Sequence, residues 1–475
     1  MNNLKKDKLN KIINHARLYG FIYNSSEIYN GIKGVYDYGP YGVEMKNNIK
    51  LFWWEYMVRY RDNIVGIDTS ILMNKNVWKS SGHYNNFNEY FIKKDTKIYK
   101  LEKFLILILN KIKPRYKKNI KKKFIKLLNL KKEKKIKKKL NKILKKHNLF
   151  NNFRIKKITL MFKTKINTLK NKSFTYLRPE TAQGIFINLK NVINSTRMKI
   201  PFGIAQIGKS FRNEIITKEF IFRTKEFEQM EMQFFVYPGE ENFWYKYWLR
   251  SRLIWHKFFK LGKQYYKIKT HKKLSHYTTY ASDIEFKYIN KFKELEGIHF
   301  RKDFDLKNHQ KYSKKKLTIY DLKNKKEYYP YVIETSLGLD RVFYSILCKS
   351  IIIEKKRIFF KLPKFIAPIK IAILPLIKIN NQIVNISKKI FDDLKYQFNI
   401  VYDDKHSIGK RYRIQDAIGT PFCVTIDKTS ILNETVTIRN RDDMKQIRCK
   451  IDSLYNFFKK EFDISFFFKK YIKNV

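Results

Sequence analysis

Two strand-like segments, 203–214 and 226–236, constrain the fold of this chain more than any other feature. About a dozen residues separate them, so we predict an antiparallel hairpin with a long loop. The two-residue period of a strand places these residues on one face: Gln206, Gly208, Ser210 and Arg212 on the first strand, and Phe227, Gln229, Glu231 and Gln233 on the second. Because buried polar groups need partners, we interpret this face as the floor of a ligand site; a sheet face open to water is the alternative.

Arginines and carboxylates occur together in three blocks, 176–186, 211–214 and 222–231. A site that contains both charges suits ligands that carry both charges, such as a polyphosphate and an ammonium group. ATP together with an amino acid has this character.

The block 330–341 predicts a strand, a break at Gly338 and the start of a helix. A helix N-terminus with Arg341 in its first turn suits a phosphate, and Glu334 and Ser336 share one face of the preceding strand. Taken alone, the block fits a capped core helix better.

Four carboxylates lie upstream of that block: Asp283, Glu285, Glu294 and Glu296. They can hold Mg²⁺ against phosphate oxygens, because that ion needs few protein carboxylates, but surface charge explains them about as well. The chain contains no Walker loop, no dinucleotide-binding glycine fingerprint and no Ser-His-Asp set. These absences argue against the corresponding classes of enzyme.

The composition is that of a globular protein of several domains with a large excess of positive charge. The chain has 475 residues, of which 44% are hydrophobic and 16% aromatic, and a formal net charge of +60. A polyanionic partner explains this charge, and so does drift towards lysine codons in an AT-rich genome. Both explanations stay open.

The cysteines and histidines indicate no metal centre. Cys348, Cys423 and Cys449 lie far apart and form no CxxC pair, so we expect neither zinc nor a disulfide framework. His271 and His276 do not share a helical face, and we assign them no role. The start of the chain lacks the apolar core of a signal peptide, and the run 104–109 is too short to span a bilayer. We therefore expect a soluble cytoplasmic protein without a membrane partner.

A lysine-rich region, 91–172, interrupts the chain. Between 111 and 150 it has 18 lysines and one acidic residue, Glu133. Apolar residues at helical spacing predict a basic amphipathic helix: Ile136, Leu140, Ile143 and Leu144. A solvated helical insertion and an arm that faces nucleic acid both fit this pattern, and binding to a membrane surface fits it less well.

The chain on either side of this region alternates between strand-like and helix-like segments. A helix is predicted at about 43–60 in the N-terminal part. After a linker at 361–368 we predict a small α/β domain over 364–475. Its expected elements are strands at 369–374, 422–426 and 435–439, and helices at 385–398 and 408–418, with a further helix at the end.

These blocks resemble class II aminoacyl-tRNA synthetases, specifically the homodimeric type of glycyl-tRNA synthetase. Arg212-Asn213-Glu214 matches motif 2 of that class, and Gly338-Leu339-Asp340-Arg341 matches motif 3. Segments 20–40, 67–72 and 77–83 look like the family's N-terminal signature, and 403–422 resembles its anticodon-binding domain. The resemblance covers most of 12–90 and 173–460, with the blocks in the family's order.

The resemblance implies an α+β fold: a class II antiparallel sheet with flanking helices, a basic helical insertion and a C-terminal α/β anticodon-binding domain. Residues 1–90 would form the N-terminal part of the catalytic domain with motif 1, and 173–360 the catalytic core with motifs 2 and 3. The expected reaction joins glycine to ATP as glycyl-adenylate and transfers it to the 3′ end of tRNA(Gly). The partners would be glycine, ATP with Mg²⁺, tRNA(Gly) and a second copy of the chain.

The resemblance also implies a role for individual residues. Those implied in catalysis are Arg212, Glu214 and Arg341. Those implied in glycine binding are Lys100, Glu180, Phe227, Glu228, Gln229, Met230, Glu231, Arg301, Glu334, Thr335, Ser336, Leu337 and Gly338. Those implied in ATP binding are Arg212, Asn213, Glu214, Phe222, Arg223, Thr224, Lys225, Glu226, Phe227, Glu294, Leu295, Gly338, Leu339, Asp340 and Arg341, with Glu294 also beside Mg²⁺.

Two lysines depart from the family's pattern. Lys100 stands where many relatives have an arginine that contacts substrate, and Lys225 stands where arginine is usual. Lysine lacks the bidentate fork of arginine, so these contacts would differ. The rival hypothesis is a non-catalytic relative that only binds nucleic acid. Loss of a motif arginine would favour it, but Arg212 and Arg341 are both present.

Overall fold

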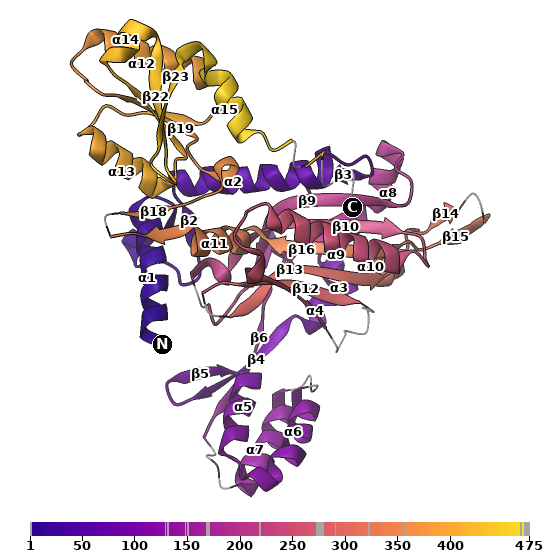
Figure 1. The fold of residues 1–475 in the computed structure, drawn as a ribbon. Coiled ribbons are helices and arrows are strands. Elements are labelled where there is room, and N and C mark those ends of the chain that lie inside the picture. Colours follow the sequence, from indigo (N-terminus) through magenta and orange to yellow (C-terminus); the bar gives the residue numbers. More distant parts are fainter. Residues whose placement is uncertain are drawn as a thin grey trace. The chain divides into compact units, whose positions relative to one another are not determined.

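The computed structural model describes residues 2–128, 130, 133–147, 149, 152–167, 172–217, 220–271, 280–289, 291–321, 324–355, 357–465 and 468–469. His276 therefore lies outside the described residues. The chain packs as two compact units, a larger one of 1–71, 180–210 and 214–475 and a smaller one of 72–179 and 211–213 (Figure 1). In the described ranges, no helix is both long enough and apolar enough to cross a membrane.

A seven-stranded sheet lies at the centre of the larger unit, with the strand order β11-β12-β13-β16-β10-β9-β3. Its strands are β3 (Ile64–Gly66), β9 (Phe202–Phe211), β10 (Glu226–Val236), β11 (Tyr266–Thr270), β12 (Ala281–Lys287), β13 (Phe292–Lys302) and β16 (Tyr331–Gly338). The pairs from β11 through β12, β13 and β16 to β10 are antiparallel, and β3 runs parallel to β9. β9 and β10 are neighbours in the sheet, as the sequence predicted.

Helices cover both faces of this sheet. They are α1 (Asn2–Leu18), α2 (Pro40–Trp54), which continues as a π-helical turn (Glu55–Arg59), α8 (Ala182–Thr196), α9 (Glu241–Lys257), α10 (Phe304–Ser313) and α11 (Leu339–Ser350). The main apolar core joins one sheet face to α2, α9 and α11. A smaller core joins one end of the other face to α8 and α10. The remainder of that second face carries the polar side chains.

The start of α2 shows how local sequence sets this packing. Pro40 occupies the first helical turn, where its missing N–H is not needed. A Cβ at Gly42 would lie 1.8 Å from the carbonyl oxygen of Phe21, so only glycine permits this approach. The predicted helix at 43–60 is confirmed, although it begins at Pro40 and changes to π-helical geometry at Glu55.

Short strand pairs and single-turn helices complete the larger unit around the sheet. The paired strands are β1 (Ile22–Asn24) with β2 (Tyr36–Tyr38), β14 (Ile319–Asp321) with β15 (Lys326–Tyr328), and β17 (Ile351–Ile353) with β18 (Ile358–Phe360). The single turns are η1 (Glu27–Tyr29), η3 (Phe220–Phe222), η4 (Lys263–Tyr265) and η5 (Lys364–Ile366).

The C-terminal part of the larger unit has its own five-stranded sheet, with the order β20-β19-β21-β22-β23. Its elements are β19 (Ile371–Pro375), α12 (Asn381–Leu394), β20 (Ile400–Tyr402), α13 (Ile408–Ile418), β21 (Phe422–Ile426), α14 (Lys428–Asn433), β22 (Thr435–Asn440), β23 (Gln446–Lys450), η6 (Ile451–Ser453) and α15 (Leu454–Phe462). The α/β prediction for this part is confirmed. The short elements β20, α14 and β23 escaped the sequence analysis.

The smaller unit contains the lysine-rich region. Its elements are α3 (Lys75–Ser80), α4 (His83–Asn86), β4 (Asn88–Lys94), β5 (Lys97–Lys100), α5 (Leu101–Lys111), α6 (Pro114–Leu128), α7 (Glu133–Lys146), β6 (Arg154–Thr159), β7 (Lys163–Asn167) and β8 (Lys172–Tyr176). The predicted amphipathic helix is α7, and its Ile136, Leu140 and Leu144 are buried against α5 and α6. The apolar stripe is therefore used inside the unit, and the lysines face outward.

Candidate active site

The polar face of the seven-stranded sheet brings together residues from four strands. Across β10 and β16, Glu231 lies opposite Ser336, and Gln233 lies opposite Glu334. Across β16 and β13, Glu334 lies opposite His299, and Ser336 lies opposite Gly297. Asp283 on β12 is paired with Gly297 and so continues the same row. The predicted polar face of β10 is confirmed, and it belongs to a wider floor.

Glu334 is the most heavily bonded carboxylate of this floor. Its Oε2 accepts hydrogen bonds from Gln233 Nε2 at 2.9 Å and from Arg301 Nη1 at 2.8 Å. Its Oε1 lies 2.9 Å from His299 Nδ1. Burial alone would raise the pKa of Glu334, but Arg301 and His299 hold it well below its usual range. The ionised form of Glu334 is therefore favoured.

Glu231 lies beside Glu334 and has the opposite electrostatic character. Thr181 Oγ1 donates to its Oε2, and Gln233 Nε2 donates to its Oε1 at 3.0 Å. Burial raises the pKa of Glu231 well above its usual range, and the charges of Glu334 and Glu180 raise it further. Burial and the neighbouring carboxylates therefore favour the protonated form of Glu231, whereas Arg301 and His299 favour the ionised form of Glu334.

Arg301 is held in a fixed orientation by α10. Its Nε and Nη2 donate to the two oxygens of Asp305 at 2.8 Å and 3.0 Å, which is the bidentate geometry of a strong charged pair. Gln183 Nε2 donates to Asp305 at 3.1 Å and to Glu180 at 2.8 Å. Arg301, Glu180 and Glu334 are thus joined in one network, as expected if all three act at one ligand.

Gln229 extends the floor towards the end of β16. Its Oε1 accepts hydrogen bonds from Ser210 Oγ at 2.8 Å and from the amide of Thr181 at 3.2 Å. Its Nε2 donates to Ser336 Oγ at 3.3 Å. Gln229 and Ser336, both predicted at the glycine site, therefore lie on the same face as Glu231.

Alternate residues of the same two strands face the other way. Glu228 forms an ion pair with Lys46 of α2 at 2.5 Å, and Asp340 accepts hydrogen bonds from Tyr38 Oη and from the Glu228 amide. Four further predicted residues lie in the main apolar core: Met230, Leu295, Leu337 and Leu339. Thr335 is buried, and its Oγ1 has no hydrogen-bond partner in the described part of the chain. The side chains of these residues therefore lie away from the polar floor, and their contacts with a ligand stay predictions.

A second group of predicted residues meets where α11 begins. Arg341 Nη1 lies 3.0 Å from Glu294 Oε1, and its guanidinium carbon lies 4.8 Å from the centre of the Phe222 ring. Glu294 is half exposed, with 50% of its side chain accessible, so its carboxylate can reach a bound ligand. Arg341, Glu294 and Phe222 were all predicted at the ATP site, and the structure brings them together.

The carboxylate of Glu214 differs from that of Glu294 in its burial and in its hydrogen bonding. It is buried, and its Oε2 has no hydrogen-bond partner among the residues described, although Arg223 Nη1 approaches to 3.6 Å. Of the other predicted ATP-site residues near it, the amide of Lys225 donates to Gly34 O at 2.8 Å, and Thr224 is buried. A buried carboxylate oxygen of this kind suits a cation that arrives with a ligand.

Further predicted residues of the same block take part in other contacts. Glu226 pairs with Lys209 at 2.5 Å. Phe227 and Gly338 lie at the ends of β10 and β16 that meet, because Gln229 is paired with Gly338. These residues stay predictions for the ATP site.

Arg212 and Asn213 belong to the smaller unit. Arg212 Nε donates to Pro179 O at 2.9 Å, and its guanidinium carbon lies 5.5 Å from the centre of the Phe87 ring. The amide of Asn213 donates to Leu160 O at 2.7 Å. Both residues therefore have a defined local environment, and their role at ATP rests on their match to motif 2.

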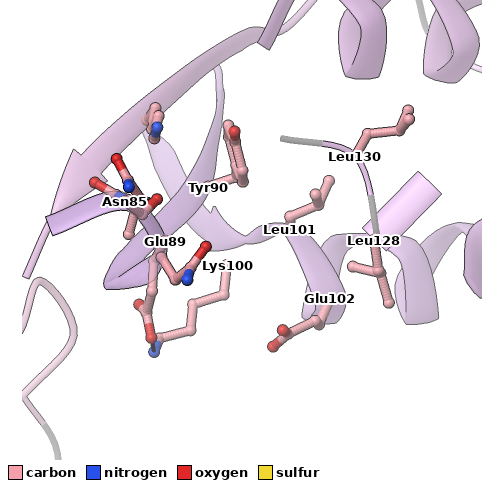
Figure 2. Close-up of a pocket in the computed structure, with 11 residues that line it drawn as sticks. Asn85, Glu89, Tyr90, Lys100, Leu101, Glu102, Leu128 and Leu130 are labelled. Carbon is pink, nitrogen blue, oxygen red and sulfur yellow. Dashed lines mark hydrogen bonds and ion pairs between the residues drawn. The ribbon is translucent and has the colours of Figure 1, made fainter. Parts of the chain in front are cut away.

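Lys100 lies at a cavity of about 340 Å³ in the smaller unit (Figure 2). Its Nζ forms an ion pair with Glu89, whose second carboxylate oxygen is buried without a hydrogen-bond partner in the described ranges. Figure 2 shows this pair on one side of the cavity and Leu128 and Leu130 on the other. The substrate contact predicted for Lys100 would have to compete with Glu89.

Three of the carboxylates considered for Mg²⁺ are already paired with basic side chains. Glu296 accepts from Arg252 at 2.6 Å and from His256 at 2.7 Å. Asp283 accepts from His271 at 2.8 Å, and Glu285 pairs with Lys267 and Lys269. No group of three or more metal-ligating side chains occurs in the part of the chain that the structure describes. Glu294 is paired as well, with Arg341, but half of its side chain is accessible, so it stays the candidate from that set.

The sequence analysis missed several residues of this site. Thr181, Gln183, His299 and Asp305 were assigned no role, although each contacts a predicted residue. His299 alternates with Arg301 on one strand, so the two-residue period was a usable signal for it. Asp305 and Gln183 come from helices, and only tertiary packing shows where they point.

Two family descriptions match the chain. "tRNA synthetase class II core domain (G, H, P, S and T)" matches residues 162–350, and "Anticodon binding domain" matches residues 370–461. These two ranges correspond to the polar sheet and to the five-stranded C-terminal sheet.

Curated relatives match over nearly the whole length. The "Glycine--tRNA ligase" of Borreliella afzelii is 43% identical over 467 residues, which cover 96% of this chain and 97% of the relative. The protein of the same name from Treponema denticola is 44% identical over 458 residues, covering 93% and 94%. That of Mesoplasma florum is 41% identical over 466 residues, covering 96% and 100%. Since both the core and the anticodon-binding domain match as well, the chain belongs to the glycine–tRNA ligase family of class II aminoacyl-tRNA synthetases.

Proposed function

We propose that this chain activates glycine with ATP and transfers the glycyl group to the 3′ end of tRNA(Gly). The observation that carries this proposal is the buried carboxylate pair Glu231 and Glu334, which Gln233 Nε2 bridges and to which Arg301 donates at Glu334. When the ammonium group of glycine binds beside this pair, its positive charge favours the ionised form of both carboxylates. Glu180, joined to the same network through Gln183, is the third carboxylate for that ammonium group.

The glycine site favours the smallest amino acid. The floor at Ser336 is already filled by the hydrogen-bonded side chains of Gln229 and Glu231 and by the backbone of Gly297. A methyl group on the substrate would clash with these atoms, and exclusion of larger side chains by a filled pocket needs no editing step.

The ATP site is proposed from motifs 2 and 3. Arg212 grips the α-phosphate, Phe227 stacks on adenine, and Arg341 contacts the terminal phosphates. Glu214 and Glu294 fit a magnesium ion that arrives with ATP, because one has a buried oxygen without a hydrogen-bond partner in the described chain and the other is half exposed. That ion would neutralise phosphate charge, and the two carboxylates would supply oxygen ligands of the kind that it prefers.

The reaction needs no nucleophile from the protein. A carboxylate oxygen of glycine attacks the α-phosphorus, the bond from that phosphorus to the bridging oxygen breaks, and pyrophosphate leaves with the electron pair. A terminal ribose hydroxyl of tRNA then attacks the glycyl carbonyl carbon, and AMP leaves. The protein contributes alignment of the two ligands and neutralisation of charge in the transition state.

Glycine-dependent ATP–pyrophosphate exchange on the purified protein tests this function. Exchange with glycine, and none with alanine or serine, is the expected result. Absence of exchange with every amino acid from a folded protein would favour the non-catalytic nucleic-acid-binding relative instead.

We also propose that the chain acts in the cytoplasm as a homodimer formed through its motif 1 region near Gly39 and Pro40. Exposed apolar side chains next to that region support the dimer, since Ile28 is 88% and Tyr29 80% exposed. Sedimentation equilibrium is expected to give twice the chain mass of 57.8 kDa, and a monomer at micromolar concentration would contradict it.

Recognition of tRNA would involve two regions, the C-terminal domain over 364–475 and the lysine-rich helices α6 and α7. On α7 the apolar stripe is buried, so its lysines face solvent with one acidic residue, Glu133, to offset them. Phosphate contacts by such lysines make binding steeply dependent on salt.

Replacing four exposed lysines of α7 by glutamine is expected to weaken tRNA binding and to reduce its salt slope by up to about one unit for each phosphate that is no longer neutralised. The four are Lys134, Lys138, Lys142 and Lys145. Glutamine keeps the helix propensity of lysine, so the fold is retained. Binding is measured by filter retention between low and moderate salt.

The matched control removes the same charge from the larger unit by replacing Lys311, Lys314, Lys315 and Lys326, all exposed. Equal effects from both sets would show that only net charge matters. No effect from the α7 set would identify the lysines as the product of codon drift. Glycine-dependent exchange without tRNA is expected to be unchanged in the α7 variant.

A further inference from the structure

His299 occupies a central position on the floor of the glycine site, although neither motif 2 nor motif 3 includes it. It lies on β13, directly opposite Glu334 on β16 and Ala281 on β12. Its Nδ1 is 2.9 Å from Glu334 Oε1, and its Nε2 is 3.8 Å from Asp283 Oδ1. The imidazole therefore stands between two carboxylates, one at each ring nitrogen.

The neighbouring backbone leaves room for this ring. A Cβ at Gly297 would lie 2.7 Å from His299 Cε1 and 3.0 Å from its Nε2. A substituted residue at position 297 would force the ring away from Glu334. The glycine, two residues before the histidine on the same face, therefore maintains the contact.

The charged groups around the ring come from every strand and segment packed against it. They are Asp283 of β12 and His271 just after β11, Arg301 of β13, Glu334 of β16, and Glu231 of β10 through Glu334. Two carboxylates contact the ring directly, while the guanidinium of Arg301 bonds the other oxygen of Glu334. The balance of these groups favours a positive charge on the ring.

We propose that His299 is a positioning residue of the glycine site: as an imidazolium it donates from Nδ1 to Glu334 Oε1 and fixes that carboxylate, with Arg301 on its other oxygen, in the orientation that receives the substrate ammonium group. This inference rests on the proposed function, since it assigns a residue to the same site. Glu334 then keeps a single rotamer and a full charge before glycine arrives, and such preorganisation lowers the cost of binding.

The electrostatics of the site agree with this geometry. Burial alone would lower the pKa of His299, but the carboxylates of Asp283 and Glu334 raise it to about 9. Without the imidazolium, Glu334 would keep Arg301 as its cationic partner and Gln233 as a neutral donor, so its ionised form would be less favoured beside Glu231.

The test compares His299→Asn with His299→Ala in glycine-dependent exchange. The Asn side-chain amide occupies the place of Nδ1 and keeps a donor to Glu334 without the charge. The alanine variant is expected to raise the KM for glycine at neutral pH about tenfold, as loss of one charge-assisted hydrogen bond does. The asparagine variant is expected to lie between it and the wild type, with kcat and the KM for ATP nearly unchanged.

The pH profile separates positioning from a merely structural role. At pH values below the His299 pKa of about 9 the ring is charged, so the lower glycine KM of the wild type relative to the asparagine variant is fully present. It is lost as pH rises through that value, and the ratio of the two glycine KM values approaches one. The titration of free glycine affects both proteins equally and cancels in the ratio.

A ratio that stays constant across this range, or an alanine variant with the wild-type glycine KM, would overturn the inference. The wild type tests the proposed function separately, because loss of exchange there concerns the reaction and not His299. In that case NMR titration of the histidine side chains still tests the His299–Glu334 contact. A His299 pKa near 9 that decreases in Glu334→Gln supports the contact. An ordinary histidine pKa would overturn it.

Discussion

Replacing Arg212 by alanine is expected to reduce glycyl-adenylate formation to a small residual rate while tRNA binding survives. The α-phosphate gains negative charge as glycine attacks it, and a guanidinium aimed at that charge acts mainly in the transition state. Removal of one such donor costs about 3–4 kcal/mol, which lowers the exchange rate by roughly 10²–10³-fold. In the proposed complex many lysines elsewhere bind the phosphate backbone of tRNA, so we expect the affinity for tRNA not to depend on this one side chain.

Pyrophosphate exchange and filter binding, measured on the same preparation, check this result. Arg212→Lys is expected to recover only part of the rate, because lysine lacks the bidentate fork. Arg197→Ala removes an exposed arginine at the C-terminal end of α8 and serves as the matched control. Since Arg212 Nε also bonds Pro179 O, thermal unfolding must show that the variant is folded. Normal exchange in a folded Arg212→Ala protein would remove Arg212 from the α-phosphate.

Periodic elements of this fold could be predicted from sequence because their signals are local. Helix α13 (Ile408–Ile418) and strand β21 (Phe422–Ile426) begin and end where predicted, since Gly419 and Pro421 mark the turn between them. The strand, glycine break and helix at 330–341 correspond to β16 and α11 for the same reason. The central strand β10 was predicted over the range 226–236, which the structure confirms.

Partners that come from distant segments could not be predicted. Asp305 accepts a hydrogen bond from Arg301, and Lys46 forms an ion pair with Glu228 on the opposite face of the sheet from Glu231. The sequence contains no periodic pattern that relates the members of either pair. The predicted glycine site also contained runs of consecutive strand residues, whose side chains point to both faces of the sheet. The structure places the side chains of Met230 and Leu337 in the apolar core. The lysine-rich region gave one helical pattern, and the structure adds two further helices and a three-stranded sheet, β5-β4-β6.

Replacing Glu231 by glutamine is expected to raise the KM for glycine roughly 10- to 100-fold and to leave the KM for ATP nearly unchanged. Loss of a charge-assisted hydrogen bond to the ammonium group costs about 1.5–3 kcal/mol, and this is the source of the expected range. Glutamine has the shape of the protonated glutamate, and Thr181 and Gln233 can still bond it. The local contacts of residue 231 are therefore preserved while the charge that binds glycine is lost.

The same substitution is expected to stabilise the protein without ligand, by an amount that depends on pH. The pKa of Glu231 is raised on folding, so its favourable contribution is complete below the ordinary glutamate pKa and is lost as pH rises towards the folded value. Each pH unit in that window costs the wild type about 1.4 kcal/mol of unfolding free energy, and glutamine does not titrate. The melting temperature of Glu231→Gln should exceed that of the wild type by more at pH 8 than at pH 4.

Glu228→Gln provides the contrast, because this neighbour on β10 faces Lys46 and not the glycine floor. Burial raises its pKa but Lys46 and Lys50 lower it further, so Glu228 is ionised and its charge stabilises the fold above the ordinary glutamate pKa. Replacing Glu228 should lower the melting temperature at neutral pH. It should change the glycine KM far less than Glu231→Gln does. If the two variants behave alike in glycine KM and in melting temperature, the alternation of faces along β10 does not govern the site. The expected result is a higher melting temperature for Glu231→Gln, a lower one for Glu228→Gln, and a large rise in the glycine KM only for Glu231→Gln. This result would establish Glu231 as a carboxylate that gives up a proton to receive the substrate.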